Sequence, residues 1–338
     1  MVSLKDISLK CGVSIATVSK ALNDQSDISA ATKVLIRDAA REMGYFPNSS
    51  AIALKTNRSY NIGVLFADEA QSGLTQEYFA HVLDSFKDEV EKYGYDITFI
   101  SRHIKPVSMS YYEHSKYRGV DGVLIACTDF YDLDVYELIS GDIPVITIDH
   151  VFNNRTAIVS DNVKGIDDLL TYLYDMGHRK IAYIHGQKSA VTQNRVGSFY
   201  KTMEKLGLSI PPNYVVEGIY HNPEDTAERT KQLLKLQDRP TCIIFPDDFA
   251  AIGGINVIKE HGLRIPEDIS IVGYDGILLS QILDPKLTTL KQDTRSMGKY
   301  AAEKLIEAIN NPKEAIIERV VVPGNVLHGN SVIKINND

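Results

Sequence analysis

Aspartates stand at the ends of several β-rich runs of the chain, where their carboxylates could meet at one ligand. These aspartates are Asp149, Asp247, Asp248 and Asp275. Ligands of open parallel sheets bind at the carboxyl ends of the strands, so these side chains are candidates for a common site. Carboxylates that face one cleft can accept hydrogen bonds from vicinal hydroxyls, which is the chemistry that a sugar needs. An aspartate at a strand end can instead cap the following helix, and this alternative is strongest for Asp247 and Asp248.

Signatures of enzymes and of metal sites are missing from the sequence. Cys11, Cys127 and Cys242 are too far apart for a C-x-x-C motif and are expected to be small core residues. The nine histidines form no H-E-x-x-H or H-x-x-x-H pair, and no G-x-G-x-x-G, Walker A or G-x-S-x-G motif occurs. We therefore predict that the protein is not an enzyme and has no metal and no cofactor.

Strand and helix patterns alternate from Tyr60 onward. The strands expected first are 62–66, 96–101, 122–125 and 144–148, with a helix at 78–93. A second set has strands at 180–185, 215–218, 241–245 and 270–273, and helices near 162–176, 194–207, 223–236 and 248–261. Such alternation predicts doubly wound parallel sheets, and two sets of elements predict two lobes.

Charge is distributed unevenly along the 338 residues. The chain has 36 Lys and Arg against 44 Asp and Glu, and this net charge of −8 excludes a basic surface over the whole protein. Residues 1–60 carry eight basic and five acidic side chains, a net charge of +3, which leaves −11 for the remainder. A basic head on an acidic body indicates that only the head meets phosphates.

The overall composition is that of a folded, soluble protein. With 44% apolar and 24% charged residues, the chain can form two or three packed domains. It has no run of about 18 apolar residues that could span a bilayer, and its first residues lack the layout of a secretory signal. We therefore expect a cytoplasmic protein, associated with the nucleoid.

Capping residues divide the basic head into three short helices. Ser3 and Asp6 form a capping box for a first helix, Ser14 can cap a second helix over 15–22, and Ser29 can cap a third. The first helix would end near Cys11 and the third near Met43, before Gly44. Two helices joined by a glycine-containing turn match a helix-turn-helix, but a three-helix bundle without a nucleic-acid role has the same pattern.

The head and the segment after it closely resemble the LacI family of transcriptional regulators. The resemblance rests on VSIATVSKALN (13–23), GYFPN (44–48) and an Ala51-x-x-Leu54 step. It implies that the second helix enters the major groove and that the base-facing residues are Ile15, Ala16 and Lys20. Lys20 can donate to guanine and is the expected main base reader, whereas the other two offer only apolar contact.

The remaining polar residues of this helix are expected to position it on the DNA backbone. They are Ser14, Thr17, Ser19 and Asn23, for which phosphate contacts and helix capping are both open. Thr17 could also pack against the first helix.

The segment 47–55 is expected to be a hinge that folds only when it is pinned, because it is too short to hold a helix alone in water. By the resemblance, two copies pack in the minor groove and Leu54 wedges between base pairs, with Lys55 at the backbone. Asn48 and Ala51 belong to the same contact region. An ordinary linker residue is the alternative for Leu54, and Ile52 departs from the arginine that is common in the family.

The resemblance continues through the body and so covers nearly the whole chain. Its landmarks include IPVITIDH (143–150), MGHRKIAYIHG (176–186), IPEDISIVGYD (265–275) and LTTLKQD (287–293). They imply an α/β fold, namely a periplasmic-binding-protein-like two-lobed core of doubly wound parallel sheets, preceded by an all-α helix-turn-helix head.

The expected domains follow from this resemblance. The head covers 1–46, the hinge helix and linker 47–59, and the effector-binding and dimerisation core 60–338. Within the core, lobe 1 comprises about 60–160 and 292–322, and lobe 2 comprises about 161–291 and 323–338, with crossings near 160, 291 and 322.

The resemblance also adds residues to the expected effector site. Arg195 and Asp275 match positions that hold effector hydroxyls or ring atoms, and Asp149 is a weaker match. The aromatic pair Tyr78 and Phe79 would help to line the pocket by stacking. An acidic partner for Arg195 and a core position for the two aromatic residues are the alternatives. Pro246 stands where the family often has asparagine, so one polar contact is expected to be lost.

The sequence thus predicts a homodimeric transcriptional regulator that binds a pseudo-palindromic operator, and the expected direction of regulation is repression. A small molecule between the lobes would control it, and the expected class of small molecule is a sugar. Control by a protein corepressor is the main alternative. An enzyme or a transport-type binding protein with an incidental head is a more distant one.

Overall fold

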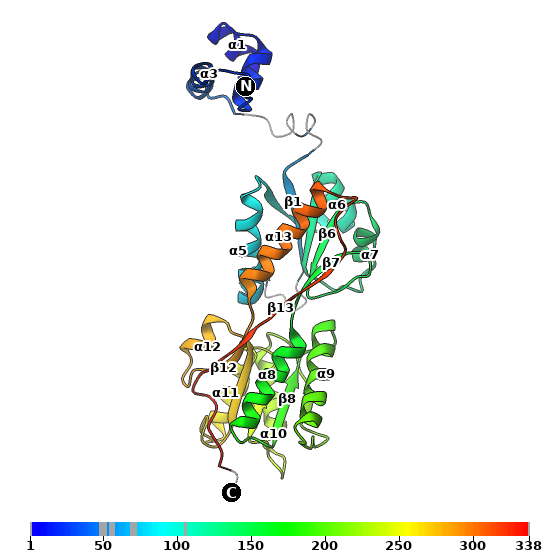
Figure 1. Cartoon of the computed structure of the whole chain (residues 1–338). Coiled ribbons are helices and arrows are strands. Elements are labelled where there is room, and N and C mark those ends of the chain that lie inside the picture. The colour runs from blue at the N-terminus through cyan, green and yellow to red at the C-terminus, as the bar shows by residue number, and fades with distance from the viewer. Residues whose placement is uncertain (1, 47–52, 54–57, 68–72, 105–106, 337–338) are drawn as a thin grey trace. The chain divides into compact units, whose positions relative to one another are not determined.

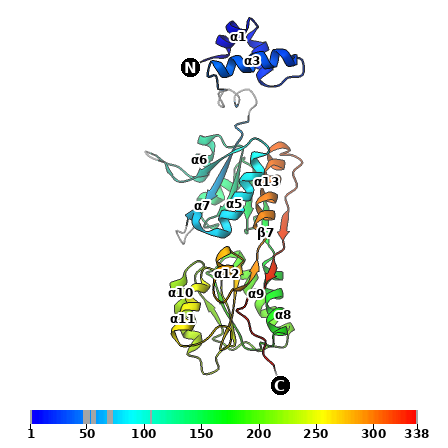
Figure 2. The ribbon, with the colours of Figure 1, turned by 90° about the vertical axis from the view of Figure 1, so that its left-hand side faces the viewer.

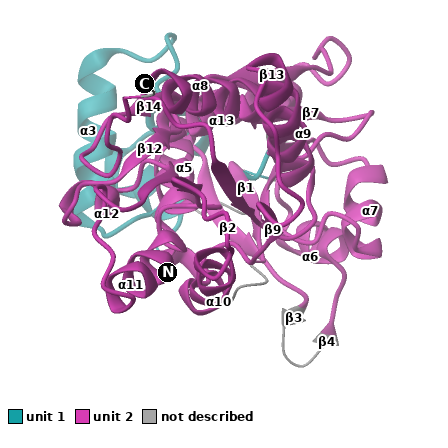
Figure 3. Ribbon diagram, turned by 90° about the horizontal axis from the view of Figure 1, so that it is seen from below, with its two compact units in different colours: residues 1–59 teal, residues 60–338 magenta. Residues whose placement is uncertain are grey.

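The structure is a computed structural model that describes residues 2–46, 53, 58–67, 73–104 and 107–336. It contains two compact units, Met1–Ser59 and Tyr60–Asp338 (Figure 3). No helix of the described residues is long and apolar enough to cross a membrane.

The first unit contains the three helices that the sequence predicts. They are α1 (Leu4–Cys11), α2 (Ile15–Leu22) and α3 (Ala30–Glu42). Ser3, Ser14 and Ser29 are their N-caps, and each side chain accepts a hydrogen bond from the backbone N–H three residues later. The helices pack around a small core of Ile7, Val18, Ala21, Ile36, Ala39 and Ala40. The predicted three-helix head is therefore confirmed.

The second unit contains two lobes, each built on a six-stranded sheet in the described part of the chain (Figures 1 and 2). The sheet of lobe 1 consists of β1 (Asn61–Phe66), β2 (Asp96–Ile100), β5 (Gly122–Cys127), β6 (Val145–Ile148), β7 (Thr156–Ser160) and β13 (Arg319–Val322). Its strands are all parallel and lie in the order β13-β7-β6-β5-β1-β2. A short hairpin of β3 (His103–Ile104) and β4 (Val107–Ser108) lies outside this sheet.

The sheet of lobe 2 repeats this arrangement. Its strands are β8 (Ile181–His185), β9 (Val215–Glu217), β10 (Cys242–Ile244), β11 (Ser270–Asp275), β12 (Thr288–Lys291) and β14 (Asn325–Leu327). They lie in the order β14-β12-β11-β10-β8-β9, and β14 alone runs antiparallel to its neighbour. The doubly wound α/β fold with two lobes is therefore confirmed.

Helices cover both faces of each sheet. In lobe 1, α5 (Glu77–Glu91) and α13 (Thr294–Asn310) cover one face, and α6 (Tyr111–Arg118) and α7 (Leu133–Ser140) cover the other. In lobe 2 the pairs are α8 (Asn162–Asp175) with α9 (Ala190–Lys205), and α10 (Pro223–Leu234) with α11 (Ala251–Glu260). Successive strand residues alternate between the two faces, so each sheet is buried on both sides. Two short helical segments, η1 (Gly73–Thr75) and α12 (Leu278–Ile282), complete the core.

The chain crosses between the lobes three times. It passes from β7 to α8, from β12 back to α13, and from β13 to β14. The α13 helix packs closely along α5, since a Cβ on Gly298 would lie 2.3 Å from the carbonyl oxygen of Val82 (Figure 1). The carboxyl ends of β6 and β11 carry Asp149 and Asp275, which the sequence singled out.

Two predicted helices begin elsewhere than expected. The α9 helix begins at Ala190, because Ser189 caps it and accepts a hydrogen bond from the backbone N–H of Thr192. The α11 helix begins at Ala251 rather than at 248, because the preceding residues form a turn closed by Asp247, whose carboxylate accepts from the N–H of Ala250.

Candidate functional site

The start of α2 is fixed by hydrogen bonds within the helix itself. The Ser14 hydroxyl accepts from the backbone N–H of Thr17 at 3.0 Å and lies 2.8 Å from the Thr17 hydroxyl. At the other end, the Asn23 side-chain amide donates to the Ser19 carbonyl at 2.8 Å. The side chains of Ser14, Thr17 and Asn23 therefore take part in capping, the structural alternative to phosphate contact, whereas Ser19 takes part only through its backbone carbonyl.

One face of α2 is open to solvent. Val18 and Ala21 are fully buried in the head, whereas Ile15, with 47% of its surface exposed, Ala16 and Lys20 are exposed. Since residues four apart share a helix face, Ala16 and Lys20 lie side by side. The Lys20 ammonium pairs with the Asp27 carboxylate. The head thus exposes all three residues that the sequence predicts to face bases. The predicted hinge contacts Asn48, Ala51, Leu54 and Lys55 lie outside the described residues.

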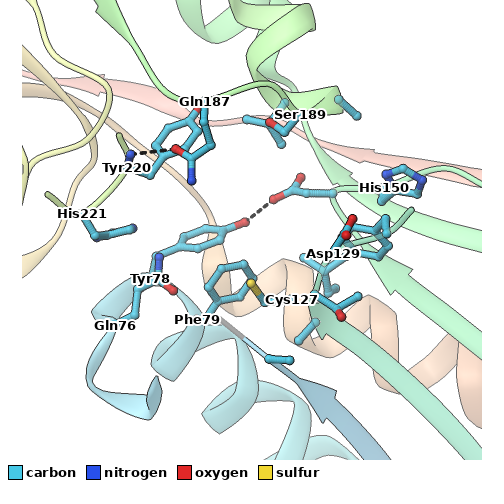
Figure 4. Close-up of a pocket in the computed structure, with 18 of the residues that line it drawn as sticks. Gln76, Tyr78, Phe79, Cys127, Asp129, His150, Gln187, Ser189, Tyr220 and His221 are labelled. Carbon is cyan, nitrogen blue, oxygen red and sulfur yellow. Dashed lines mark hydrogen bonds between the residues drawn. The ribbon is translucent and has the colours of Figure 1, made fainter. Parts of the chain in front are cut away.

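A cavity of about 240 Å³ lies between the two lobes. It is lined from lobe 1 by Gln76, Tyr78, Phe79, the loop 127–131, Asp149 and His150, and from lobe 2 by 187–191, Arg195, Tyr220, His221 and Asp275, together with Gln292 at a crossing. Figure 4 shows labelled side chains around the cavity from both lobes, including Gln76, Tyr78 and His150 from lobe 1 and Gln187, Tyr220 and His221 from lobe 2. The predicted residues Tyr78, Phe79, Asp149, Arg195 and Asp275 all belong to this lining.

Asp275 forms the buried acidic part of the cavity. Its Oδ1 accepts a 2.7 Å hydrogen bond from the Gln292 side chain, and its backbone φ of 109° lies in a region that L-residues rarely adopt. Burial, helped by the neighbouring carboxylate of Asp247, raises the pKa of Asp275 to about 7. Among the described residues Gln292 is its side-chain partner, so the second carboxylate oxygen is available to a ligand.

Arg195 is held rigidly on α9. Its Nε donates to Asn162 at 2.7 Å and one Nη to the Pro246 carbonyl at 3.2 Å, while its guanidinium lies 3.5 Å over the centre of the Tyr274 ring. No carboxylate pairs with it directly at hydrogen-bonding distance in the described structure. The guanidinium is therefore preorganised, and its second Nη can donate to a ligand.

Tyr78 and Asp149, both from lobe 1, form a hydrogen bond with each other in the lining of the cavity. The Tyr78 hydroxyl donates to Asp149 at 2.7 Å, and the other carboxylate oxygen accepts from the backbone N–H of Ser160 at 2.8 Å. Burial raises the pKa of Asp149, and these two hydrogen bonds counteract the rise. Asp149 and His221 both have positive φ, near 55°, so strained backbone recurs around the cavity.

Asp247 does not line the cavity, which departs from the expectation that it binds the effector. One of its carboxylate oxygens accepts from the N–H of Ala250 at 2.8 Å and the other from the N–H of His221 at 2.9 Å. Both oxygens are therefore used in holding backbone, as the capping alternative requires. Asp248 is likewise turned to backbone, since it accepts from the N–H groups of Gly276 and Ile277. Asp247 thus holds the backbone of His221, which does line the cavity.

Several residues that line the cavity were not predicted from the sequence. Gln76 and Gln292 are more than nine-tenths buried, and within the described residues neither Oε1 has a hydrogen-bond partner. Gln187 accepts from the backbone N–H of Tyr220 at 3.0 Å, which positions that ring. None of these residues belongs to a motif. Only the place of Gln292 directly after a β-strand, like that of the aspartates, could have drawn attention to it.

Across the described ranges, no group of three or more His, Cys, Asp and Glu side chains is arranged to hold an ion.

Comparisons with known proteins agree with this architecture. The family model of the bacterial regulatory proteins of the lacI family matches residues 3–48, and that of periplasmic binding protein-like domains matches residues 170–332. The HTH-type transcriptional repressor PurR of Haemophilus influenzae is 32% identical over 321 residues, 94% of each chain. PurR of Mannheimia succiniciproducens is 30% identical over 99% of this chain and 100% of its own.

A solved structure extends the similarity to three dimensions. The lac repressor dimer bound to operator and the anti-inducer ONPF aligns with a TM-score of 0.83 and 25% identity, over 98% of this chain and 99% of that one. A helix-turn-helix head and a two-lobed ligand-binding core define a DNA-binding transcriptional regulator. The chain belongs to the lacI family of bacterial regulatory proteins, and like its relatives it is a regulator and not an enzyme.

Proposed function

We propose that this protein represses transcription as a homodimer on a pseudo-palindromic operator, and that a sugar bound between the lobes controls it. The observation that carries the proposal is the interlobe cavity, in which Arg195 and Asp275 from lobe 2 face Tyr78 and Asp149 from lobe 1. The repressor relatives support the direction of regulation. Such a protein acts in the bacterial cytoplasm, where the DNA lies.

Unused hydrogen-bond acceptors favour a sugar as the effector. The buried Oε1 atoms of Gln76 and Gln292 have no partner among the described residues, and one carboxylate oxygen of Asp275 is available. Leaving such atoms unpaired is costly, so a ligand with several hydroxyl donors would be stabilised here. Arg195 would donate to a ring or hydroxyl oxygen, and Tyr78 and Phe79 would cover an apolar ring face.

Control requires that the effector bind one arrangement of the lobes better than another. The lining comes from both lobes and from Gln292 in one of the three segments that connect them. A bound ligand would therefore contact both lobes and this connecting segment. It would therefore favour one relative position of the lobes. The conformation of the segments that lead to the head would change with it.

Two-fold pairing is supported by exposed apolar side chains on the core. Phe99 on the edge strand β2 and Leu278 and Ile282 on α12 are 48%, 67% and 69% exposed. Exposed apolar surface of this kind is typical of protein interfaces. The lac repressor is described as a dimer on its operator. A dimer would present two heads to two half-sites.

On each half-site, α2 would lie in the major groove. Lys20 would read a guanine, Ile15 and Ala16 would contact apolar base edges, and the polar residues Ser14, Thr17, Ser19 and Asn23 would approach phosphates. The hinge residues Asn48, Ala51, Leu54 and Lys55 would contact the minor groove between the half-sites.

The test begins with the melting temperature of the full-length protein in the presence of sugars, sugar phosphates and purine and pyrimidine bases. A ligand at about 100 times its dissociation constant adds roughly 2.7 kcal/mol to the free energy of unfolding, which is easily detected. We expect a sugar to stabilise the protein and to change its affinity for an operator selected from random duplexes. The Asp275→Ala variant should lose the shift, whereas the Asp268→Ala variant should keep it, because the half-buried Asp268 pairs with Arg264 and does not line the cavity.

Each other outcome contradicts a defined part of the proposal. Stabilisation by a nucleobase alone would replace the sugar with a purine-like or pyrimidine-like effector. An operator affinity that no small molecule changes would favour a protein corepressor, to be sought by pull-down on operator DNA. Absence of sequence-selective DNA binding at low salt would overturn the regulatory function itself.

A further inference from the structure

The loop between α2 and α3 carries an aspartate that binds two cations of the head. Asp24 lies just beyond the end of α2, and its Oδ1 pairs with the Lys33 ammonium at 3.0 Å and with the Arg37 guanidinium at 2.8 Å. The Lys33 ammonium also donates to the backbone carbonyl of Asp24 at 3.1 Å. Because Lys33 and Arg37 lie four residues apart on α3, they share a face of that helix, and one carboxylate reaches both.

The backbone conformation of Asp24 fixes this loop on the end of α2. Its φ of 59° lies in the left-handed region, which aspartate and asparagine adopt more readily than most residues. The next N–H along the chain, that of Gln25, donates to the Lys20 carbonyl at 3.0 Å and turns the loop back onto the helix. Only 16% of the Lys33 side chain is exposed. Lys33 is therefore held at the end of the recognition helix and does not extend into solvent.

Ion pairs neutralise most of the basic side chains of the head. Residues 2–46 carry six basic and five acidic side chains. Four of the six basic side chains pair with a carboxylate, namely Lys33 and Arg37 with Asp24, Lys20 with Asp27, and Lys10 with Glu42. Within residues 2–46, Asp24 alone pairs with two cations. The hydrogen bond from Lys33, followed by that from Arg37, lowers the pKa of Asp24, so its carboxylate is ionised at neutral pH.

Binding to DNA of any sequence depends on the same basic side chains. A lysine or arginine that neutralises a phosphate releases a counterion, and this release supplies essentially all of the affinity for non-operator DNA. A cation that already pairs with a carboxylate must give up that pair before it gains a phosphate. On an operator, base contacts fix the position of the head, so a free cation gains only a phosphate that lies within its reach. On other DNA the head can slide until its free cations meet phosphates.

We infer that Asp24 is a specificity-determining residue of the head, which withholds Lys33 and Arg37 from phosphates and so weakens binding to non-operator DNA. Asp24 acts through these two cations of α3 and not through a base contact of its own. The inference goes beyond the function proposed above, because it concerns non-operator DNA and depends neither on the effector nor on the direction of regulation.

The experiment measures binding of the full-length protein to the selected operator and to a scrambled duplex by fluorescence anisotropy, at KCl concentrations from about 50 to about 200 mM. Asp24→Asn removes the negative charge but keeps a residue that tolerates left-handed backbone. Asp38→Asn is the matched control, since it makes the same change of charge at an exposed position of α3 and leaves the pairs of Lys33 and Arg37 intact.

We expect Asp24→Asn to raise the affinity for the scrambled duplex by roughly three- to tenfold and the affinity for the operator by less. The slope of log affinity against log salt on the scrambled duplex should steepen by up to about 1.8 per head, the value for two additional phosphates. Asp38→Asn should raise both affinities alike and by less. Arg37→Gln should have little effect in the wild type, where Arg37 is paired, but should reverse part of the gain in the Asp24→Asn background.

Three results would overturn the inference. Equal gains from Asp24→Asn and Asp38→Asn on the scrambled duplex would show that only the net charge matters. Weaker binding of both duplexes by Asp24→Asn would show that Asp24 serves only to hold the loop in place. Weaker binding of the scrambled duplex by Arg37→Gln alone would show that Arg37 already contacts phosphates. None of these results bears on the proposed function, which fails instead if the wild type binds the operator no better than the scrambled duplex.

Discussion

The recognition face of α2 and the interlobe cavity both hold residues suited to binding, but they hold them in opposite ways. On α2, Ile15 and Lys20 are displayed on the exposed side of a helix whose stability comes from Val18 and Ala21 on its buried side. In the cavity, Arg195 and Asp275 are themselves buried and are fixed by side-chain and backbone partners.

The two regions differ in how closely the binding role of a residue is coupled to the stability of the fold. A recognition residue can change without disturbing the packing of its helix, so the head can acquire new base preferences at little cost in folding. A cavity residue takes part in the hydrogen-bond network that holds its lobe together, and backbone strain at Asp149, His221 and Asp275 adds to the constraint. Substitutions in the two regions should therefore differ in their effect on stability.

At a fixed pH near 7, the largest loss of stability is expected for Arg195→Leu. The substitution removes the Arg195 donor to the buried Pro246 carbonyl and leaves Asn162 Oδ1 with only the longer hydrogen bond from the Tyr274 hydroxyl, so the free energy of unfolding should fall by about 3 kcal/mol. Urea unfolding of the ligand-free protein measures this. Arg264→Leu is the control, since its exposed guanidinium pairs only with Asp268 in the described structure, and it should unfold like the wild type. Equal stability of the two variants would contradict the expectation that the cavity residues also stabilise the fold.

The next effect concerns the head alone. Lys20→Ala should weaken binding to the selected operator by roughly 1 to 3 kcal/mol and relax base choice at one position, because a donor to guanine is lost. The melting temperature should not change. Fluorescence anisotropy with operator and scrambled duplexes at fixed salt measures both affinities, and Lys10→Ala on α1, which pairs with Glu42, is the control. If Lys20→Ala weakened both duplexes equally, the lysine would be a phosphate contact.

The same contrast explains what the sequence could predict. The helices of the head depend on residues close together in the chain, such as Ser14 and Thr17, so capping rules located them correctly. The alternation of strands and helices likewise predicted the two lobes. The predicted cavity residues came partly from the ends of strands, where Asp149 and Asp275 lie, and the fold class made those positions interpretable.

The rest of the cavity depends on contacts between distant segments. Gln76, Tyr220 and Gln292 reach it from three different loops, and no local periodicity marks them. For Asp247 the sequence allowed both ligand binding and capping, and the choice depends on the N–H of His221, which lies 26 residues away. Side-chain pairing of this kind is fixed by tertiary structure and not by spacing.

The buried Asp275 makes the stability of the protein depend on pH. Its pKa is raised to about 7 in the folded protein from a normal value of 3.8, so between these values the folded state binds a proton that the unfolded state has lost. The wild type should therefore lose stability as the pH rises from about 4 to about 7, by at most about 1.4 kcal/mol per pH unit from this group. Asp275→Asn should remove that contribution, which parallel urea titrations at each pH would measure. A constant difference in stability between the two proteins across this range would rule out the linkage.

The smallest effect is expected for Asp27→Asn. It tests whether a substitution on the exposed face of the head can change operator affinity without changing stability. In the described head, the Asp27 carboxylate pairs with the Lys20 ammonium on the surface, so its loss should leave the melting temperature unchanged. Operator affinity should rise about two- to threefold at low salt, because Lys20 is released and a negative charge is removed from the DNA-facing side. Asp38→Asn makes the same change of charge on α3 and separates the two causes. If both variants tighten binding equally, only the net charge matters. If Asp27→Asn tightens operator binding more than binding to scrambled DNA, the Lys20–Asp27 pair restrains the base reader itself.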